Sequence, residues 1–232
     1  MKKKSDRASG RKTFQNRSNL AVPPSARVIE KRIVILLASL IKHRCASCLD
    51  KRFVGRYREI LTLFSRYQKK VLAGYPLKVR CGKNCGICCN HWPEDTYSFE
   101  VQYIADYLKK RRSRDIDRIT KVLQADVQRL DRIKKAVSAR LTDPEERAAV
   151  GDIDPYDVAL SGFYQMNRPC PLLDRNGSCS IYAIRPFTCR VYVSFSSPEL
   201  CRPGRILDGK TMTYLLDLEK DTSELFDRLH FM

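Results

Sequence analysis

The stretch that decides how this chain is organised reads Cys81-Gly-Lys-Asn-Cys85-Gly-Ile-Cys88-Cys89, the first cysteine block. The second cysteine block runs from Cys170 to Cys201, and 80 residues separate it from the first block. Its successive cysteines are separated by 8, 9 and 11 residues. Thiolates are soft ligands that select zinc, copper(I) or iron–sulfur clusters. Four cysteines in nine residues favour such a site over scattered buried thiols. We therefore expect one inorganic centre, with a candidate ligand set of Cys81, Cys85, Cys88, Cys89, Cys170, Cys179, Cys189 and Cys201.

The spacing of the two blocks favours an iron–sulfur cluster, with zinc as the alternative. Structural zinc usually takes paired C-x2-C or H-x3–5-H units, which the second block lacks, whereas iron–sulfur clusters accept irregular spacing. The expected ligands are Cys81, Cys85 and one of Cys88 or Cys89 from the first block, and Cys179 and Cys189 from the second. Because neighbouring residues cannot easily face one centre, the other member of the 88–89 pair is either a spare thiol or a ligand of a second metal.

The order of short motifs adds a resemblance. The first block is followed by Cys170-Pro-Leu-Leu, by Cys179-Ser-Ile-Tyr and by Arg185-Pro-x2-Cys189-Arg190. This combination resembles the YkgJ-type cysteine-cluster family, whose CxxCxxCC domain is described as zinc- or iron-chelating. The resemblance covers roughly residues 80–201, although the first spacing here is x3 rather than x2. It implies a metal centre. Through the related flagellin lysine N-methylases, it also implies an alternative function, a SAM-dependent lysine N-methyltransferase with a protein substrate.

Hydrophobic periodicity predicts a mainly α protein in which the irregular cysteine-rich loops are joined by a helical excursion. We expect a disordered basic tail over residues 1–27, a basic helical segment over 28–76 and a cysteine-cluster domain over 77–232, with a helical insertion over 94–165. Asp143-Pro144 and Asp154-Pro155 each place an N-cap acid before a proline, which predicts two helix starts. Residues 212–218 and 223–231 also look helical, and short extended pieces are expected at 180–182 and 190–195.

The charge is unevenly distributed. Residues 1–80 hold 21 Lys and Arg against 4 Asp and Glu, whereas residues 81–232 hold 23 against 22. Such asymmetry points to an anionic partner for residues 1–80, either nucleic acid or an acidic membrane surface. A zinc-containing nucleic-acid-binding protein is therefore the other alternative function. Phe53, Tyr57, Phe64 and Tyr67 lie among these charges, but their helical spacing favours core packing over base stacking.

Several further features have plainer interpretations. No apolar run of signal-peptide length follows Met1–Lys4, so we expect a cytoplasmic protein, whose reduced cysteines favour metal ligation over disulfides. No thioredoxin-like pattern surrounds the pair Cys45-x2-Cys48, so we expect two thiols on one helical face, with a second metal half-site as the alternative. His91 is expected to pack or to meet solvent, although a ligand role is open. Arg185 and Arg190 could cap the C-terminal carbonyls of a turn, pair with acids or offset thiolate charge.

Overall fold

The computed structural model describes residues 22–43, 47–82, 84–93, 96–205 and 212–230. Within these ranges the chain is mainly α-helical, as expected. The α-helices are α1 (Pro24–Lys42), α2 (Lys51–Ala73), α3 (Ser98–Arg111), α4 (Ile116–Arg140), α5 (Pro144–Val150), α6 (Pro155–Gln165) and α7 (Lys220–His230). Short 3-10 helices are η2 (Ile87–Asn90), η3 (Ser113–Asp115), η4 (Tyr182–Ile184) and η5 (Pro198–Cys201), and the strands are β1 (Tyr192–Ser194) and β2 (Thr213–Leu215).

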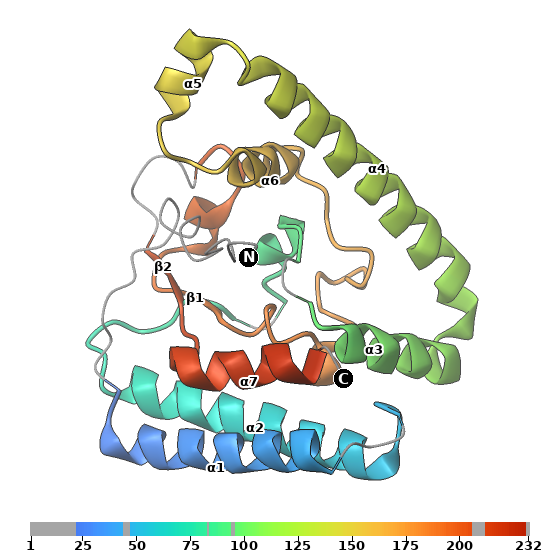
Figure 1. Cartoon of the computed structure of the whole chain (residues 1–232), viewed down its shortest axis with the longest axis vertical. Coiled ribbons are helices and arrows are strands. Elements are labelled where there is room, and N and C mark those ends of the chain that lie inside the picture. Colours follow the sequence, from blue (N-terminus) through green and yellow to red (C-terminus); the bar gives the residue numbers. More distant parts are fainter. Residues whose placement is uncertain (1–21, 44–46, 83, 94–95, 206–211, 231–232) are drawn as a thin grey trace, which may run out of the picture.

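The helices α1, α2 and α7 form one layer of the molecule (Figure 1). Proline at the first turn of α1 loses no internal hydrogen bond there, and the helix begins at Pro24 rather than at residue 28 as expected. Asp50 caps α2 by accepting a hydrogen bond of 2.7 Å from the Arg52 N–H. Val28 lies on the outer side of α1 and is 68% exposed. Of the predicted tail over residues 1–27, residues 1–21 lie outside the described residues.

The apolar face of α2 is buried as the sequence predicted. Phe53, Tyr57, Phe64 and Tyr67 all lie in the main hydrophobic core, so these rings are not available for base stacking. The same core takes in buried side chains of α1, α3 and α7 and of the second cysteine block. The basic helical segment and the cysteine-cluster domain therefore share one core, which ties the cysteine-rich loops to the helical layer.

The excursion between the two cysteine blocks is helical. Figure 1 shows α4 along one edge of the molecule, with α5 past its far end and α6 beside the far half of α4. The predicted caps are confirmed: Asp143 accepts from the Glu145 N–H at 2.8 Å, and Asp154 accepts from the Tyr156 N–H at 2.7 Å. Helix α4 packs against α6 around a small second core of Leu130, Ala159 and Phe163.

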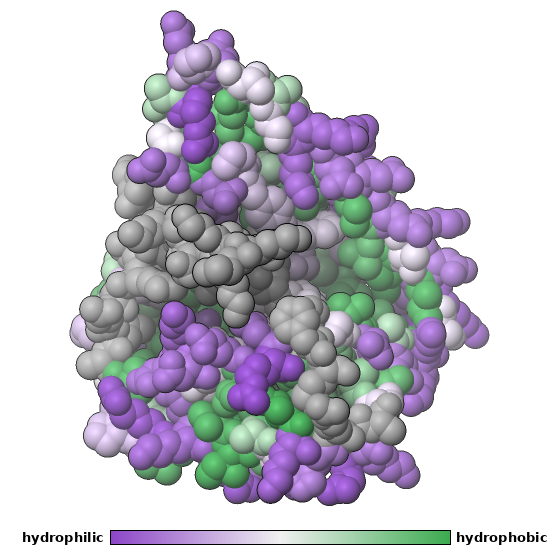
Figure 2. Space-filling view, viewed as in Figure 1, coloured by the Kyte–Doolittle hydropathy of each residue, from purple (hydrophilic) through white to green (hydrophobic). Residues whose placement is uncertain are grey.

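The apolar stripe of α4 is only partly buried. Ile119 and Leu130 are buried, but Leu123 and Val127 are 40% and 44% exposed, because no described element covers this middle part of the helix. Figure 2 shows green hydrophobic atoms among the purple hydrophilic side chains in this region. None of the helices in the described part of the chain is both long and apolar enough to cross a membrane.

The chain after the second cysteine block forms a strand, β2, rather than a helix at this point. The expectation of a helix over residues 212–218 is wrong, because β2 pairs antiparallel with β1 in the register Val193↔Tyr214. This pairing buries Tyr214 and lets the Leu216 N–H donate to the Val191 carbonyl at 2.8 Å. The extended piece expected at 190–195 is confirmed by β1, whereas residues 180–182 form no strand and lead into η4. Helix α7 confirms the last predicted helix.

Candidate metal centre

The first cysteine block is a sequence of tight turns. The Cys85 N–H donates to the Gly82 carbonyl at 3.2 Å, the Cys89 N–H to the Gly86 carbonyl at 3.0 Å, and the His91 N–H to the Cys88 carbonyl at 3.2 Å. These i to i+3 bonds close one turn after another and end in η2, which carries Cys88 and Cys89. The backbone therefore presents several thiols from a short segment, which is what a ligand loop requires.

The two cysteine blocks are in direct contact although 80 residues separate them in the sequence. The Cys170 N–H donates to the Cys89 carbonyl at 2.9 Å, and the Ser178 hydroxyl donates to the side-chain oxygen of Asn84. A Cβ atom on Gly86 would lie 3.0 Å from the Gly177 carbonyl oxygen, so only glycine fits at this contact without movement. The structure thus brings together the two blocks that the sequence assigned to one site.

Two further thiols meet at Ser194 in β1. The Ser194 N–H donates to the Cys81 Sγ at 3.1 Å, and the Cys201 Sγ donates to the Ser194 Oγ at 3.4 Å. Tyr164 of α6 donates its hydroxyl to the Cys201 carbonyl. Cys201 is therefore held close to Cys81 by a strand, a helix and η5. The sequence placed Cys201 in the candidate set but offered no signal for the role of Ser194.

Electrostatics disfavour ionisation of most of these thiols in the absence of a cation. Burial raises the pKa of Cys81, and the neighbouring Cys88, Cys85 and Cys201 thiols raise it further. Burial raises the pKa of Cys189 to about 12, with Cys170 and Cys88 adding to the effect. A metal ion would reverse this balance, because thiolates are stabilised by coordination to a cation.

Cys88 and Cys89 differ from each other. A hydrogen bond from the Cys89 thiol, assisted by the nearby Arg185, lowers the pKa of Cys88 to about 7. The same hydrogen bond raises the pKa of Cys89 far above its ordinary value. Cys88 is exposed and Cys89 is only partly exposed. The hydrogen bond between them therefore favours the thiolate form of Cys88 and the thiol form of Cys89.

The loop of the second block is fixed from behind by buried polar groups. Arg190 donates to the carbonyls of Ala183 at 2.8 Å and Arg185 at 3.1 Å, which confirms the predicted capping role for this arginine. Glu100 of α3, 1% exposed, accepts hydrogen bonds from the Phe187 N–H at 2.7 Å and from the Tyr57 hydroxyl. Phe187 lies two residues before Cys189, so this carboxyl anchors the loop that carries Cys189. Glu100 was not among the residues predicted for the site, because in the sequence it has the pattern of an ordinary acid in the first turn of a helix.

The other candidates lie beside the thiols or away from them. The His91 ring stacks on Tyr164 with a centroid distance of 3.7 Å, and burial lowers the pKa of the imidazole to about 4, so His91 is neutral and packs as expected. Cys48 lies in a turn and donates to Gln102 Oε1 at 3.1 Å, which corrects its expected position on a helix, because α1 ends at Lys42. Cys45 lies outside the described residues.

The donor set fits a soft metal, although the side chains are not already arranged around one. All nine cysteines in the described ranges are free thiols, and eight of them belong to the two blocks. Across the same ranges, no three Cys, His, Asp or Glu side chains are arranged to hold an ion. Binding therefore requires side-chain rotation of the thiols on loops that are already in contact. Such rotation is compatible with metal loading that is coupled to local ordering.

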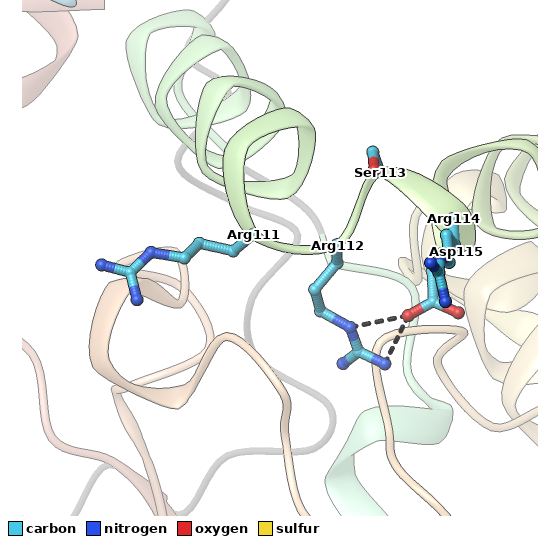
Figure 3. Close-up of a pocket in the computed structure, with 5 residues that line it drawn as sticks. All are labelled: Arg111, Arg112, Ser113, Arg114 and Asp115. Carbon is cyan, nitrogen blue, oxygen red and sulfur yellow. Dashed lines mark hydrogen bonds and ion pairs between the residues drawn. The ribbon is translucent and has the colours of Figure 1, made fainter.

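Two cavities border the excursion. One of about 320 Å³ lies between the cysteine blocks and is lined by residues of both, including Gly86, Asn90 and Leu173. The other, of about 260 Å³, lies at the junction of α3 and α4 and is lined by Arg111–Asp115. Figure 3 shows the Arg112 guanidinium paired with the Asp115 carboxylate there, and the closest nitrogen–oxygen distance of this ion pair is 2.6 Å. Only the first is adjacent to the thiols.

Comparison with known proteins gives one match. The model of the CxxCxxCC family, described as a "putative zinc- or iron-chelating domain", matches residues 80–202, which are 123 of the 232 residues. The matched segment begins one residue before Cys81 and ends one residue after Cys201. No curated protein and no solved structure matches the chain.

Proposed function

This chain belongs to the CxxCxxCC family, and from that premise we propose that it holds an iron–sulfur centre, rather than zinc, through the thiolates of both cysteine blocks. The physiological role that we propose is structural or redox. The observation that carries the proposal is the contact between the blocks, in which the Cys170 N–H donates to the Cys89 carbonyl at 2.9 Å across 80 intervening residues. Ligands drawn from both blocks would link the ends of the helical excursion.

The chemistry of the donors supports a soft centre. The candidate ligands are all thiols, and soft thiolates select zinc or iron–sulfur clusters over hard cations. Iron–sulfur clusters tolerate the irregular spacing of the second block and are stabilised by hydrogen bonds to their cysteine sulfurs. Ser194 supplies such a bond, since its N–H lies 3.1 Å from the Cys81 Sγ. When bound, the centre would neutralise the thiolates and add cross-links between the loops.

The proposed role follows from two properties of the chain. The loops of the second block are secured by Glu100 and Arg190, so the metal site is continuous with the hydrophobic core and supports a structural role. Cys81 and Cys88, in contrast, are exposed to solvent. Exposed ligand residues are the positions at which an oxidant or a redox partner would first meet the centre.

The test is anaerobic purification followed by analysis of iron, zinc and acid-labile sulfide together with an absorption spectrum. We expect a brown protein that contains iron and inorganic sulfide in comparable amounts. A colourless protein with stoichiometric zinc and no sulfide would refute the iron–sulfur proposal and retain the thiolate site. A protein without iron or zinc would refute metal binding by this chain.

A second candidate function is binding of nucleic acid through the basic surface of α1 and α2. Helix α2 carries seven Lys and Arg against one acid, Glu59, which pairs with Arg32 of α1 at 3.3 Å. Arg66, Lys69 and Lys70 are exposed on the same helix. Since the aromatic side chains of α2 are buried, the basic side chains would bind phosphates and would not read sequence.

This candidate is tested with a double-stranded DNA oligonucleotide of arbitrary sequence at several salt concentrations. Lys69→Gln with Lys70→Gln should weaken binding and reduce the salt slope by up to about 0.9 for each phosphate that is no longer neutralised. The matched control, Lys134→Gln with Lys135→Gln, changes two exposed lysines of α4 and should leave both the affinity and the slope unchanged. Equal effects of the two double variants, undetectable binding at low salt or preference for acidic vesicles would refute the nucleic-acid proposal.

A further inference from the structure

We infer that Arg185 donates a hydrogen bond from its buried Nε–H group to a sulfur atom of the bound metal centre, whose negative charge its guanidinium offsets. The inference rests on the proposed metal-binding function and deepens it, because it names a residue that is not a ligand but sets how firmly the centre is held. It applies to zinc and to an iron–sulfur cluster, since thiolates bind both.

The fold places Arg185 inside the loop that carries two of the candidate ligands. One turn of this loop begins at Cys179, whose carbonyl accepts from the Tyr182 N–H at 3.1 Å. Another turn ends at Cys189, whose N–H donates to the Pro186 carbonyl at 3.0 Å. Arg185 lies between these turns, and its guanidinium is close enough to both thiols to interact with them electrostatically. The backbone therefore fixes a cation next to the thiols of the second block.

The Arg185 side chain has a donor to spare. Its Nε atom is buried, yet within the described ranges it has no hydrogen-bond partner. No ion pair among the same residues involves Arg185. A guanidinium donates from all its N–H groups and accepts at none, and a buried donor without an acceptor is rare in folded proteins. This donor in a cysteine-rich loop therefore points to an acceptor that the bound centre supplies.

The other arginine of this loop, Arg190, serves a different purpose. Its side chain donates to the carbonyls of Ala183 at 2.8 Å and Arg185 at 3.1 Å, so it holds the backbone of the loop. The Arg185 guanidinium instead lies over the exposed ring of Tyr182, with 4.4 Å between its central carbon and the ring centroid. A cation above a ring face is held by its charge and uses none of its N–H donors. The stacking is therefore compatible with a hydrogen bond from Nε to sulfur.

The chemistry of a thiolate-bound centre matches this side chain. The guanidinium also interacts with Cys88, so it lies near candidate ligands of both blocks. Hydrogen bonds to the sulfurs and the net charge around a cluster are among the factors that set its reduction potential. Arginine suits this position because its N–H donors are fixed in one plane and its charge does not depend on pH. Lysine shares the charge but has no equivalent of the Nε–H group.

The test follows the release of metal to a chromogenic chelator from anaerobically purified full-length protein. It compares Arg185→Gln with Arg175→Gln, which removes the same charge from an exposed position of the second block. Arg185→Gln should release metal about 10- to 100-fold faster, in line with the loss of affinity when a group that hydrogen-bonds a metal ligand is removed. Arg175→Gln should release it at the unaltered rate. With an iron–sulfur cluster, Arg185→Gln should also make the midpoint potential more negative, because the reduced cluster carries more negative charge.

Two further variants separate hydrogen bonding from packing. Arg185→Lys keeps the charge and loses the Nε–H group, so its release should be slower than that of Arg185→Gln and faster than that of its control, Arg175→Lys. Tyr182→Leu removes the exposed ring under the guanidinium and should leave the release rate unchanged. A role of Arg185 confined to this stacking would instead make Tyr182→Leu as fast as Arg185→Gln.

The outcomes separate this inference from the proposed function. If either Arg185 variant releases metal at the rate of its Arg175 control, or if Tyr182→Leu matches Arg185→Gln, the inference is wrong while metal binding stands. If the unaltered protein contains no metal, the proposed function fails and the inference fails with it. Zinc in place of iron and sulfide refutes only the iron–sulfur proposal, since the release rates still decide. Should Arg185→Gln not fold, Arg185→Lys and Arg175→Lys decide by the same comparison.

Discussion

Replacing Glu100 by alanine should destabilise the protein far more than replacing any exposed acid. The carboxyl is 1% exposed and accepts hydrogen bonds from the Tyr57 hydroxyl, from the Phe187 N–H at 2.7 Å and from the Tyr97 N–H at 3.1 Å. Alanine would leave these three donors without their acceptor, at a cost of about 1–3 kcal/mol for each that water cannot reach. We expect a total of about 3–5 kcal/mol, since breaking a buried charged network falls in this range.

The assay is urea unfolding followed by circular dichroism, together with metal analysis of each variant. The matched control is Asp106→Ala on the same helix, which removes only the exposed ion pair with Lys110 and should cost about 0.5 kcal/mol or less. Glu100→Gln should fall between the two, because its amide oxygen can still accept from Phe187 while its NH2 group faces the Tyr97 N–H. Metal content should fall with Glu100→Ala, since Cys189 follows the anchored Phe187.

The result that would refute this reasoning is a loss of stability for Glu100→Ala no larger than for Asp106→Ala. Such a result would mean that the three donors find other partners and that the loop before Cys189 does not depend on the carboxyl. A large loss of stability with unchanged metal content in the folded fraction would retain the network and refute its role in positioning the ligand loop.

The same carboxyl should produce a pH dependence of stability with a defined sign. Burial raises the pKa of Glu100 above its ordinary value of 4.5, so the folded state binds this proton more tightly than the unfolded chain. The resulting stabilisation is complete below the unfolded pKa and is lost as the pH rises through the folded pKa. The unaltered protein should therefore lose stability relative to Glu100→Gln as the pH is raised from about 4. Urea midpoints of both proteins at a series of pH values check this, and the opposite trend would contradict it.

Two further predictions concern the contact between the cysteine blocks. Cys189→Ser should lower both the metal content and the melting temperature, because metal binding contributes to folding, whereas Cys48→Ser should change neither. Metal analysis and thermal unfolding measure the two quantities. A Cys189→Ser protein with full metal content would exclude Cys189 as a ligand. Gly177→Ala should cost about 1 kcal/mol more than Gly204→Ala in urea unfolding. Both glycines have φ near +80°, but only at Gly177 would an added Cβ lie close to a backbone oxygen, that of Asn84, at 3.2 Å. An equal loss of unfolding free energy for the two variants would show that the backbone at this contact moves easily.

Much of the helical architecture could be predicted because its determinants are local. The apolar repeat of α2 predicted the burial of Phe53, Tyr57, Phe64 and Tyr67, since helical spacing alone places these side chains on one face. The Asp-Pro steps at residues 143 and 154 predicted the starts of α5 and α6, because an N-cap oxygen and the φ angle of proline act within one turn.

Predictions that depended on a distant partner were less successful. The stripe of α4 has helical spacing, but whether Leu123 and Val127 are buried depends on a covering element, and α6 packs only beyond them. Residues 213–215 became a strand because β1 supplies hydrogen bonds to their backbone. A partner in tertiary structure can override local preference over such short segments.

The sequence by itself determined the chemistry of the candidate site. Eight cysteines in two blocks identify soft ligands, and the order of their motifs identifies the family, because residue type and spacing carry this information directly. Which thiols face one another was decided by the tertiary structure alone. The directions of Cys88 and Cys89 depend on the 3-10 helix that carries them, and the approach of Cys201 to Cys81 depends on Ser194, a strand residue more than a hundred positions from Cys81. Contacts between residues so far apart arise from the packing of the helical excursion, which no local spacing records.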